Sequence, residues 1–431
     1  MSLATYIQNI GQQAKKASRL IAAASPAAKN NALLYLADLL DQRRPEIQAA
    51  NARDVKAALA GGMDKARCDR LTITPAIISE MIHACRHIAA LPDPVGAMEK
   101  QWQQPNGLLV GRMRVPLGVI AMIYEARPNV TIDAAILCLK AGNAVILRGG
   151  SEALHSNLAL ASLLHEALIH ANLTPEAAQV LDITDRNAVT ALCKLDTCID
   201  VIIPRGGENL VRVVCEAATM PVLKHYKGVC HLFVDADAPL VEAVDIAFNS
   251  KVQRPAACNA LECILVHVDS ADAFLPLLLK KLGPAGVQFK ACPRAFPLLQ
   301  HAALLGASAP LKPYIHMQEP TDLGMEFHDL TLAICVVDSL DTALDHIAAH
   351  GSRHTEVICT NSYSHAQRFL READASMVAV NASTRFNDGG QLGLGAEIGI
   401  STSKLHAYGP MGVEELTTTK FVVTGQGQVR I

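Results

Sequence analysis

Cys258 has neighbours that a cysteine packed in a core would not need. It lies in the stretch QRPAACNALEC (253–263), behind a Gln-Arg-Pro triplet and before an asparagine. The thiolate is the nucleophilic form of cysteine, and nearby cations lower the pKa of a thiol from about 8.5. Lys251 and Arg254 precede Cys258 in a polar loop, where both could lower its pKa. Most free cysteines behave as small buried hydrophobic residues, which is our interpretation of Cys263.

A second polar stretch, YEARPNVTIDAA (124–135), follows an apolar segment and leads into a helical one. Pro128 restricts its backbone, and the Asn129 amide could donate a hydrogen bond to an oxyanion. One such donor contributes about 10²–10³ in rate. Glu125 and Arg127 share the loop. From the residues alone, an equally open interpretation is that Asn129 only caps the following helix.

A strand, an arginine, two glycines and a glutamate occur twice, in VILRGGSEAL (145–154) and VIIPRGGENL (201–210). Glycines at a strand-to-helix turn let backbone N–H groups approach a phosphate, and the helix N-terminus adds partial positive charge. The arginine could bind the extra phosphate that distinguishes NADP from NAD. Neither copy has the GxGxxG pattern, and one copy alone could be a simple tight turn. The repetition favours nucleotide binding, with candidate residues Arg148, Gly149, Gly150, Ser151, Glu152, Gly206 and Gly207.

The segment from Arg385 to Gly412 contains seven glycines among polar side chains. So many flexible backbone positions favour a loop that wraps a small ligand. The alternative is a flexible connector between domains, which would be more monotonous and more charged.

The length, charge and composition of the chain favour a folded protein of more than one domain and argue against a nucleic-acid-binding or membrane protein. The 431 residues predict two or three domains, and a chain that is 50% hydrophobic and 18% charged is typical of a folded protein. A net charge of -3 gives no basic surplus, so we expect no nucleic-acid partner. We find no secretory signal pattern and no apolar run near the roughly 18 residues of a membrane span. The twelve cysteines form no CxxC pair and no zinc-like pattern with histidine, which predicts reduced thiols in a cytoplasm and no metal site.

The pattern of apolar residues predicts two α/β domains in series. The first hundred residues are predicted to be helical, with Ser25-Pro26 capping a helix through Leu40. Short β-branched runs then alternate with helical segments, which indicates βαβ units and parallel sheets. These strands are expected at 144–148, 201–205, 230–235, 262–268, 330–337 and 355–360. The end of the chain, TTTKFVVTGQGQVRI, predicts a strand that pairs with a sheet of a second subunit.

Taken together, the chain resembles the aldehyde dehydrogenase superfamily and, within it, the γ-glutamyl phosphate reductase family. The resemblance covers essentially the whole chain and rests on six blocks in order: YEARPNVT, LKAGNAVILRGGSEA, NSKVQRPAACNALE, GSRHTEVI, GAEIGIS and HAYGPMG. It implies an α/β fold with a Rossmann-type cofactor domain, an α/β catalytic domain and a β-strand oligomerisation extension. The implied bounds are 1–236 (with 391–412 returning to it), 237–390, and 101–114 with 413–431.

The resemblance also implies an activity. It implies NADPH-dependent reduction of L-glutamate 5-phosphate to L-glutamate 5-semialdehyde, with release of phosphate, in proline biosynthesis. In this interpretation Cys258 is the nucleophile, Asn129 the oxyanion donor, Arg148 a contact of the adenosine ribose, and Glu326 in GMEFHDL a contact of the nicotinamide ribose. Candidate substrate contacts are Glu125, Arg127, Arg254 and Arg385.

Two departures from the superfamily pattern affect this interpretation. Oxidising members have a glutamate general base in a Glu-Leu-Gly-Gly stretch, whereas this chain has VLKHYKGVCHLFVD, with Lys224 near that place. Without that base, water is poorly activated against a thioester, which fits a reductase. The second departure is Tyr408, where we expect an arginine. A CoA-acylating aldehyde dehydrogenase and a non-catalytic two-domain small-ligand binder are the alternatives.

The resemblance also implies partners. We expect a homodimer or a tetramer, because closed two-fold contacts dominate soluble oligomers. No amino-acid kinase sequence precedes the reductase-like sequence, so a separate glutamate 5-kinase is expected to make the substrate and to be a transient partner.

Overall fold

The computed structural model describes residues 2–305 and 314–430, and these residues form two compact units. The first unit contains residues 1–224, 393–400 and 410–431, and the second contains 225–392 and 401–409. Within the described ranges, no helix is both long and apolar enough to cross a bilayer. All twelve cysteines are free thiols.

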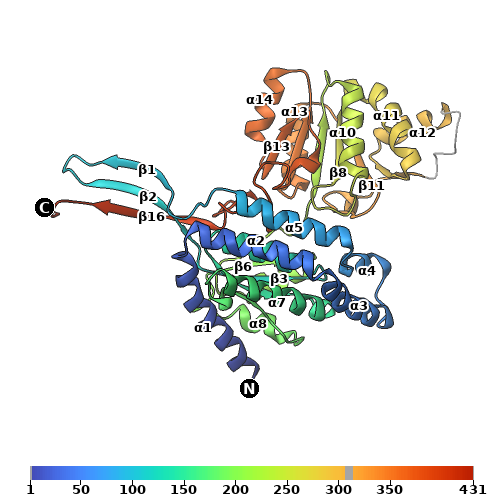
Figure 1. Ribbon diagram of the computed structural model, residues 1–431. Helices are drawn as coiled ribbons and strands as arrows, with labels where there is room; N and C mark the ends of the chain where they lie inside the picture. Colours follow the sequence, from blue (N-terminus) through green and yellow to red (C-terminus); the bar gives the residue numbers. More distant parts are fainter. Residues whose placement is uncertain (1, 306–313, 431) are drawn as a thin grey trace. The chain divides into compact units, whose positions relative to one another are not determined.

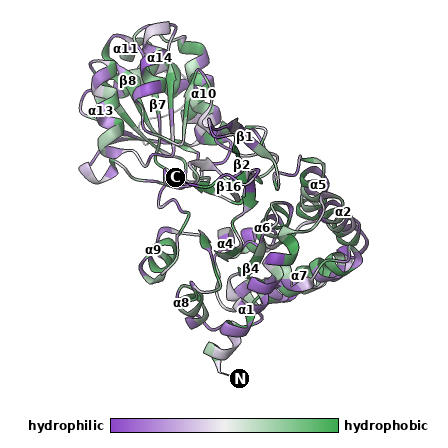
Figure 2. Ribbon diagram, turned by 90° about the vertical axis from the view of Figure 1, so that its left-hand side faces the viewer, coloured by the Kyte–Doolittle hydropathy of each residue, from purple (hydrophilic) through white to green (hydrophobic). Residues whose placement is uncertain are grey.

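The first unit begins with helices, as predicted, and they are α1 (Leu3–Ala22), α2 (Pro26–Gln42), α3 (Arg44–Ala60), α4 (Lys65–Leu71) and α5 (Pro75–Ala90). The Ser25 hydroxyl accepts a hydrogen bond from the Ala28 N–H, and Pro26 occupies the first turn of α2. This confirms the predicted cap, because the serine oxygen satisfies a helix N–H that has no partner within the helix. Buried residues recur every three or four positions on α1 and α5, which is typical of amphipathic helices, and Figure 2 shows hydrophobic and hydrophilic residues mixed along them.

A four-stranded parallel sheet follows, in the order β5-β4-β3-β6. Its strands are β3 (Val119–Tyr124), β4 (Ala144–Arg148), β5 (Ala178–Val180) and β6 (Val201–Arg205). The helices between and after them are α6 (Val130–Lys140), α7 (Leu154–His170), α8 (Asn187–Leu192) and α9 (Glu208–Ala217). The chain moves outward from β3 to β5 and then returns to the other side of β3 with β6. Ligands of such sheets bind at the carboxyl ends of the strands, near this change of direction.

The second unit contains a seven-stranded parallel sheet in the order β10-β9-β11-β8-β7-β12-β13. Its strands are β7 (Cys230–Val234), β8 (Leu261–His267), β9 (Gln288–Ala291), β10 (Ile315–Met317), β11 (Thr331–Val337), β12 (Thr355–Cys359) and β13 (Met377–Val380). One face packs against α10 (Leu240–Val252), α11 (Val268–Leu282) and α12 (Ala295–Leu305). The other face packs against α13 (Leu340–His350) and α14 (Tyr363–Glu372).

The expected boundaries need correction in two places. Strand β7 falls inside the range 1–236 that was expected to form the first domain, but it pairs with β8 and β12 of the second sheet. The returning segment 391–412 is also divided, because 401–409 belongs to the second unit. A strand pattern shows that a segment is buried in a sheet but does not show which sheet contains it, so the sequence could not place β7.

The terminal strand has a partner within its own chain. Strands β1 (Met98–Gln103), β2 (Leu109–Pro116) and β16 (Thr417–Thr424) form a three-stranded antiparallel sheet, seen in Figure 1 as a narrow ribbon. Strand β16 pairs with β2 from Thr417 opposite Pro116 to Thr424 opposite Leu109. The predicted strand is therefore confirmed, and β2 of the same chain is one of its partners, while the expected pairing with a second subunit stays a prediction.

Candidate active site

Cys258 lies in the loop between α10 and β8, three residues before the strand begins at Leu261. Two contacts fix its backbone. The Cys230 thiol lies 3.3 Å from the Cys258 carbonyl oxygen and donates a hydrogen bond to it. A Cβ added to Gly228 would lie 1.9 Å from the same oxygen, so only glycine fits there. Cys258 as a residue is neither fully buried nor fully exposed.

Two histidines accompany Cys258 in the second unit. His225 precedes β7, and His354 is the residue immediately before β12. Strands β8, β7 and β12 are parallel neighbours, so the residues that precede them meet at one edge of the sheet. The two imidazole rings lie 5.6 Å apart in an edge-to-face arrangement. The topology of the sheet therefore brings together three residues that are far apart in the sequence.

These histidines change the chemistry of the thiol. Burial alone would raise the pKa of Cys258, but His354 and His225 stabilise the thiolate, and the pKa lies well below its ordinary value. The sequence predicted that Lys251 and Arg254 would have this effect. For Lys251 that is wrong, because its fully buried ammonium lies 2.7 Å from a carboxylate oxygen of Glu262. A cysteine paired with histidine is an activated nucleophile.

One arginine, Arg385, interacts electrostatically with Cys258. Burial lowers the pKa of Arg385, and the neighbouring Arg254 lowers it further, while Cys258 opposes this shift. Arg385 is held by a hydrogen bond of 2.8 Å from its Nε to the Gln253 side chain. Arg254 and Arg385, two predicted substrate contacts, therefore interact electrostatically with each other. Arg385 also interacts with Cys258. Such a group can attract a phosphate dianion.

The asparagine after Cys258 has a structural role. The buried Asn259 amide donates to the Asn387 carbonyl oxygen at 2.9 Å, and Asn387 donates to the His354 carbonyl oxygen at 3.1 Å. The loop that carries Cys258 is thus connected to the segment before β12 by two hydrogen bonds that pass through Asn387. This answers why an asparagine follows Cys258: its side chain positions the loop relative to His354.

Asn129 lies in the first unit at the start of α6. Among the described residues, its side chain accepts no hydrogen bond from a helix N–H, so the interpretation of Asn129 as a side-chain cap is wrong. Its amide instead donates to the Asp133 carboxylate at 3.0 Å. Burial raises the pKa of Asp133 to about 6, while Asn129 and Arg205 oppose this shift. Asp133 thus holds the Asn129 amide in one orientation and leaves its second N–H for another acceptor.

The first glycine turn, at the end of β4, fits an anionic ligand. Arg148 is almost fully buried, and its Nε has no hydrogen-bond partner in the part of the chain that the structure describes. A buried guanidinium N–H without a partner is costly, and a phosphate oxygen would satisfy it. A Cβ at Gly149 would lie 2.2 Å from the Asn157 side chain, so packing alone already requires this glycine.

The second glycine turn, at the end of β6, already binds an anion of the protein. The Gly207 N–H donates to the Glu125 carboxylate at 3.0 Å, and Glu125 also lies against Gly206. Glu125 therefore occupies the position at the N-terminus of α9 that was predicted for a phosphate. A cofactor phosphate at this turn would have to displace it.

A cavity of about 250 Å³ opens beside these turns within the first unit. Its lining combines three arginines with two glutamates, and the predicted residues Glu125, Arg127 and Glu152 are among them. The full lining is Met63, Arg67, Arg70, Glu125, Ala126, Arg127 and Glu152. The predicted residues Arg127 and Glu152 thus face one cavity, although they come from different loops.

Glu326 and Tyr408 have partners in the second unit. Glu326 lies close enough to Glu262 to raise the pKa of that buried carboxyl, an effect that adds to burial. The Tyr408 hydroxyl, which replaces the expected arginine, donates to Asp374 at 3.2 Å, and Lys404 also binds Asp374. Tyr408 therefore has a structural contact that an arginine in its place would change.

Comparisons with known proteins agree with this architecture. Residues 3–289 match the model of the aldehyde dehydrogenase family. The chain is 68% identical over 430 residues to a γ-glutamyl phosphate reductase from Desulfovibrio desulfuricans and 65% identical over 430 residues to one from Nitratidesulfovibrio vulgaris, with 100% of each chain covered. The crystal structure of γ-glutamyl phosphate reductase from Thermotoga maritima is 42% identical and matches with a TM-score of 0.93, covering 99% of this chain and 100% of the other.

Proposed function

The chain belongs to the aldehyde dehydrogenase family and, within it, to the γ-glutamyl phosphate reductases, and on this premise we propose that it reduces L-glutamate 5-phosphate to L-glutamate 5-semialdehyde in proline biosynthesis. The observation that supports this most is the Cys258 thiol, whose pKa His354 and His225 lower against the effect of burial. A reductase of an acyl phosphate needs a group that attacks the acyl carbon, and a thiolate is suited to this step.

In the first step, the Cys258 thiolate attacks the acyl carbon and the bond to the phosphate oxygen breaks. Arg385 and Arg254 are proposed to stabilise the departing phosphate, since Arg385 interacts electrostatically with Cys258 and with Arg254. Asn129 is proposed to donate its second amide N–H to the oxyanion, in the orientation that Asp133 holds. The product of this step is a thioester on Cys258, and phosphate is released.

NADPH, when bound, supplies the hydride that reduces the thioester. The preference for NADPH is proposed to come from Arg148, whose buried Nε has no partner in the described chain. Gly149, Gly150, Ser151 and Glu152 form the turn beside it, and Gly206, Gly207 and Glu326 remain proposed cofactor contacts. Collapse of the reduced intermediate releases the aldehyde and returns Cys258 as a thiolate.

The assembly is also proposed. The ribbon of β1, β2 and β16 exposes large apolar side chains, with Phe421 at 66% and Val423 at 56% of full exposure. Apolar residues on a sheet with an open edge favour contact with another subunit. We propose a homodimer or a tetramer built through this ribbon, and a separate glutamate 5-kinase as a transient partner. A cytoplasmic location also remains a proposal, supported by the free cysteines.

The test runs the reaction backwards, from semialdehyde and NADP. The expected result is one NADPH per active site without phosphate and sustained turnover once phosphate is added, because Lys224 stands near the position of the usual general base. Cys258→Ala should abolish the burst, while the matched variant Cys263→Ala keeps it. Sustained formation of free glutamate without phosphate would contradict the proposal, and turnover with CoA in place of phosphate would favour the CoA-acylating alternative.

A further inference from the structure

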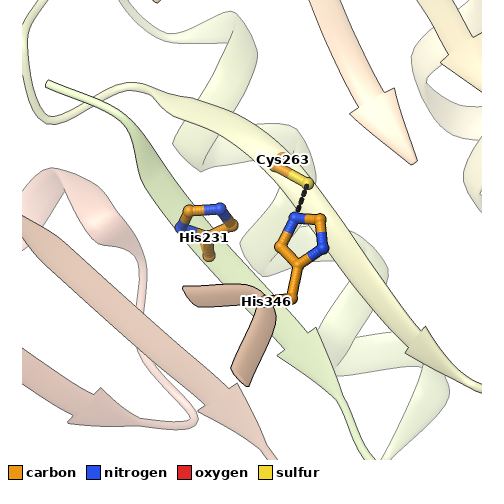
Figure 3. Close-up of side chains that lie close together, drawn as sticks. All are labelled: His231, Cys263 and His346. Atoms are coloured by element: carbon orange, nitrogen blue, oxygen red, sulfur yellow. Dashed lines mark hydrogen bonds between the residues drawn. The ribbon is translucent and has the colours of Figure 1, made fainter. Parts of the chain in front are cut away.

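Three metal-ligating side chains meet inside the second unit, on the sheet face that α13 covers. His231 lies on β7, Cys263 on β8 and His346 on α13, and Figure 3 shows them pointing toward one another. His231 and Cys263 are paired in the parallel register, so both side chains project from the same face of the sheet. One ligand atom from each of the three residues lies within 4.8 Å of the others. None of these residues takes part in the chemistry proposed for Cys258.

The orientation of His231 is fixed by a carboxylate. Its Nδ1 lies 2.9 Å from a carboxylate oxygen of Glu356, and both side chains are fully buried. Its Nε2 is buried without a hydrogen-bond partner in the part of the chain that the structure describes. Histidines that bind metals usually donate their other ring N–H to a carboxylate or a carbonyl, as His231 is placed to do. If the three residues only filled the core, this ring nitrogen would stay unsatisfied, which is costly.

The other two residues can also provide lone pairs. The Cys263 sulfur lies 3.9 Å from His346 Nε2. A neutral imidazole ring nitrogen, such as His346 offers, is the commonest metal ligand in proteins. A cysteine loses its thiol proton when a metal binds. His346 is only half-buried, which leaves a route for an ion from the α13 side.

We propose that His231, Cys263 and His346 form a binding site for a divalent metal ion of the zinc class, with Glu356 as the residue that orients His231. Two imidazole nitrogens and one thiolate are a ligand set that zinc accepts, with water in the fourth position. Ligand atoms around a tetrahedral zinc are separated by about 3.3–3.8 Å, so separations of up to 4.8 Å must close by at most about 1.5 Å. Rotation of the half-buried His346 can provide this movement. The ion would tie α13 to β7 and β8.

The site was not predicted from the sequence because its residues follow no short spacing pattern. The CxxC and HxxxH patterns detect ligands that lie close together in the chain. Here the ligands come from two paired strands and a helix that packs over them, so only the fold brings them together. The expectation of no metal site rested on spacing alone.

The test is a cobalt titration of the full-length chain after treatment with a chelator. The background carries Cys258→Ser, so that the catalytic thiol cannot bind the probe. We expect one equivalent of Co²⁺ to produce a thiolate-to-cobalt charge-transfer band and the visible bands of a tetrahedral ion, and Zn²⁺ to remove both. Glu356→Gln should weaken binding by about 10–100-fold, the usual effect of losing a residue that orients a ligand.

His346→Gln should abolish the tetrahedral bands, and Cys263→Ser should abolish the charge-transfer band. The matched control is His301→Gln, an exposed histidine on α12, which should leave every band unchanged. Circular dichroism of each variant confirms that it is folded, and the two ligand variants test the site independently. A charge-transfer band that persists in Cys263→Ser, or the absence of cobalt binding to the folded parent, would overturn the proposal.

Discussion

Asp133 provides the sharpest test of how the first unit holds its candidate oxyanion donor. The carboxyl group lies one turn after Asn129 on α6 and accepts a hydrogen bond of 3.0 Å from its amide. Burial raises its pKa from the ordinary value of 3.8 to about 6, although Asn129 and Arg205 oppose the shift. The folded protein therefore bears a cost for keeping Asp133 ionised at neutral pH. Replacement by asparagine keeps an acceptor oxygen for Asn129 but removes the ionisation.

The size and sign of the effect follow from the shift of the pKa. A difference of about 2.2 units, multiplied by 1.36 kcal/mol per unit, gives about 3 kcal/mol. The pKa is raised in the folded state, so the cost is absent below about pH 4, grows between the two pKa values and is complete above about pH 6. Asp133→Asn should thus raise the free energy of unfolding by up to about 3 kcal/mol near pH 8, and by roughly half of that near pH 5.

The assay is unfolding of the wild type and Asp133→Asn by denaturant between about pH 5 and about pH 8, followed by circular dichroism. Asp196→Asn is the matched control, because Asp196 is exposed. It should change the unfolding free energy by no more than about 0.5 kcal/mol at any pH. An Asp133→Asn variant that is no more stable than the wild type, or whose gain does not change with pH, would refute the reasoning. It would mean that the carboxylate is compensated in the folded state by groups other than Asn129 and Arg205.

Three further predictions concern the other parts of the molecule. His354→Asn should raise the pKa of Cys258, so that alkylation of this thiol at neutral pH slows and its pH midpoint rises; an unchanged midpoint would remove His354 from the site. Arg148→Ala should raise the KM for NADPH much more than that for NADH, whereas equal losses would place Arg148 away from the 2′-phosphate. Deletion of residues 417–431 should remove β16 and reduce the mass of the particle in light scattering, and an unchanged number of subunits would contradict the proposed role of the ribbon.

Local patterns predicted the elements of this chain better than its long-range contacts. The cap at Ser25 and the strands at 144–148 and 201–205 depend on neighbouring residues, and the structure confirms them. Strand β7 was assigned to the wrong sheet, because its partners β8 and β12 come later in the chain. Neighbouring residues determine that a segment forms a strand, whereas the topology of the fold determines which strands it pairs with.

The same distinction explains what was found and missed at the candidate site. Cys258 could be identified from its unusual neighbours, but the causes of its low pKa could not. Lys251 is nearer to Cys258 in the sequence than either histidine is, yet it pairs with Glu262, and the distant His354 and His225 act on the thiol. A search for histidines just before strands of a parallel sheet could have found both, because neighbouring parallel strands begin at one edge. Asp133 follows Asn129 at the spacing of one helical turn, a signal that was present and unused.

Strand β7 shows how two polar groups can share one sheet without sharing a function. Its successive side chains point to opposite faces, so Cys230 and His231 are directed to different sides of the sheet. Cys230 donates to the Cys258 carbonyl oxygen, and its neighbours two and four residues on, Leu232 and Val234, pack in the core beneath α10 and α11. His231 lies between Glu356 and Cys263 on the face that α13 covers. Because the backbone of the strand separates the two groups, Cys263→Ser, which keeps the pair of His231 and Glu356, should leave the reactivity of Cys258 intact.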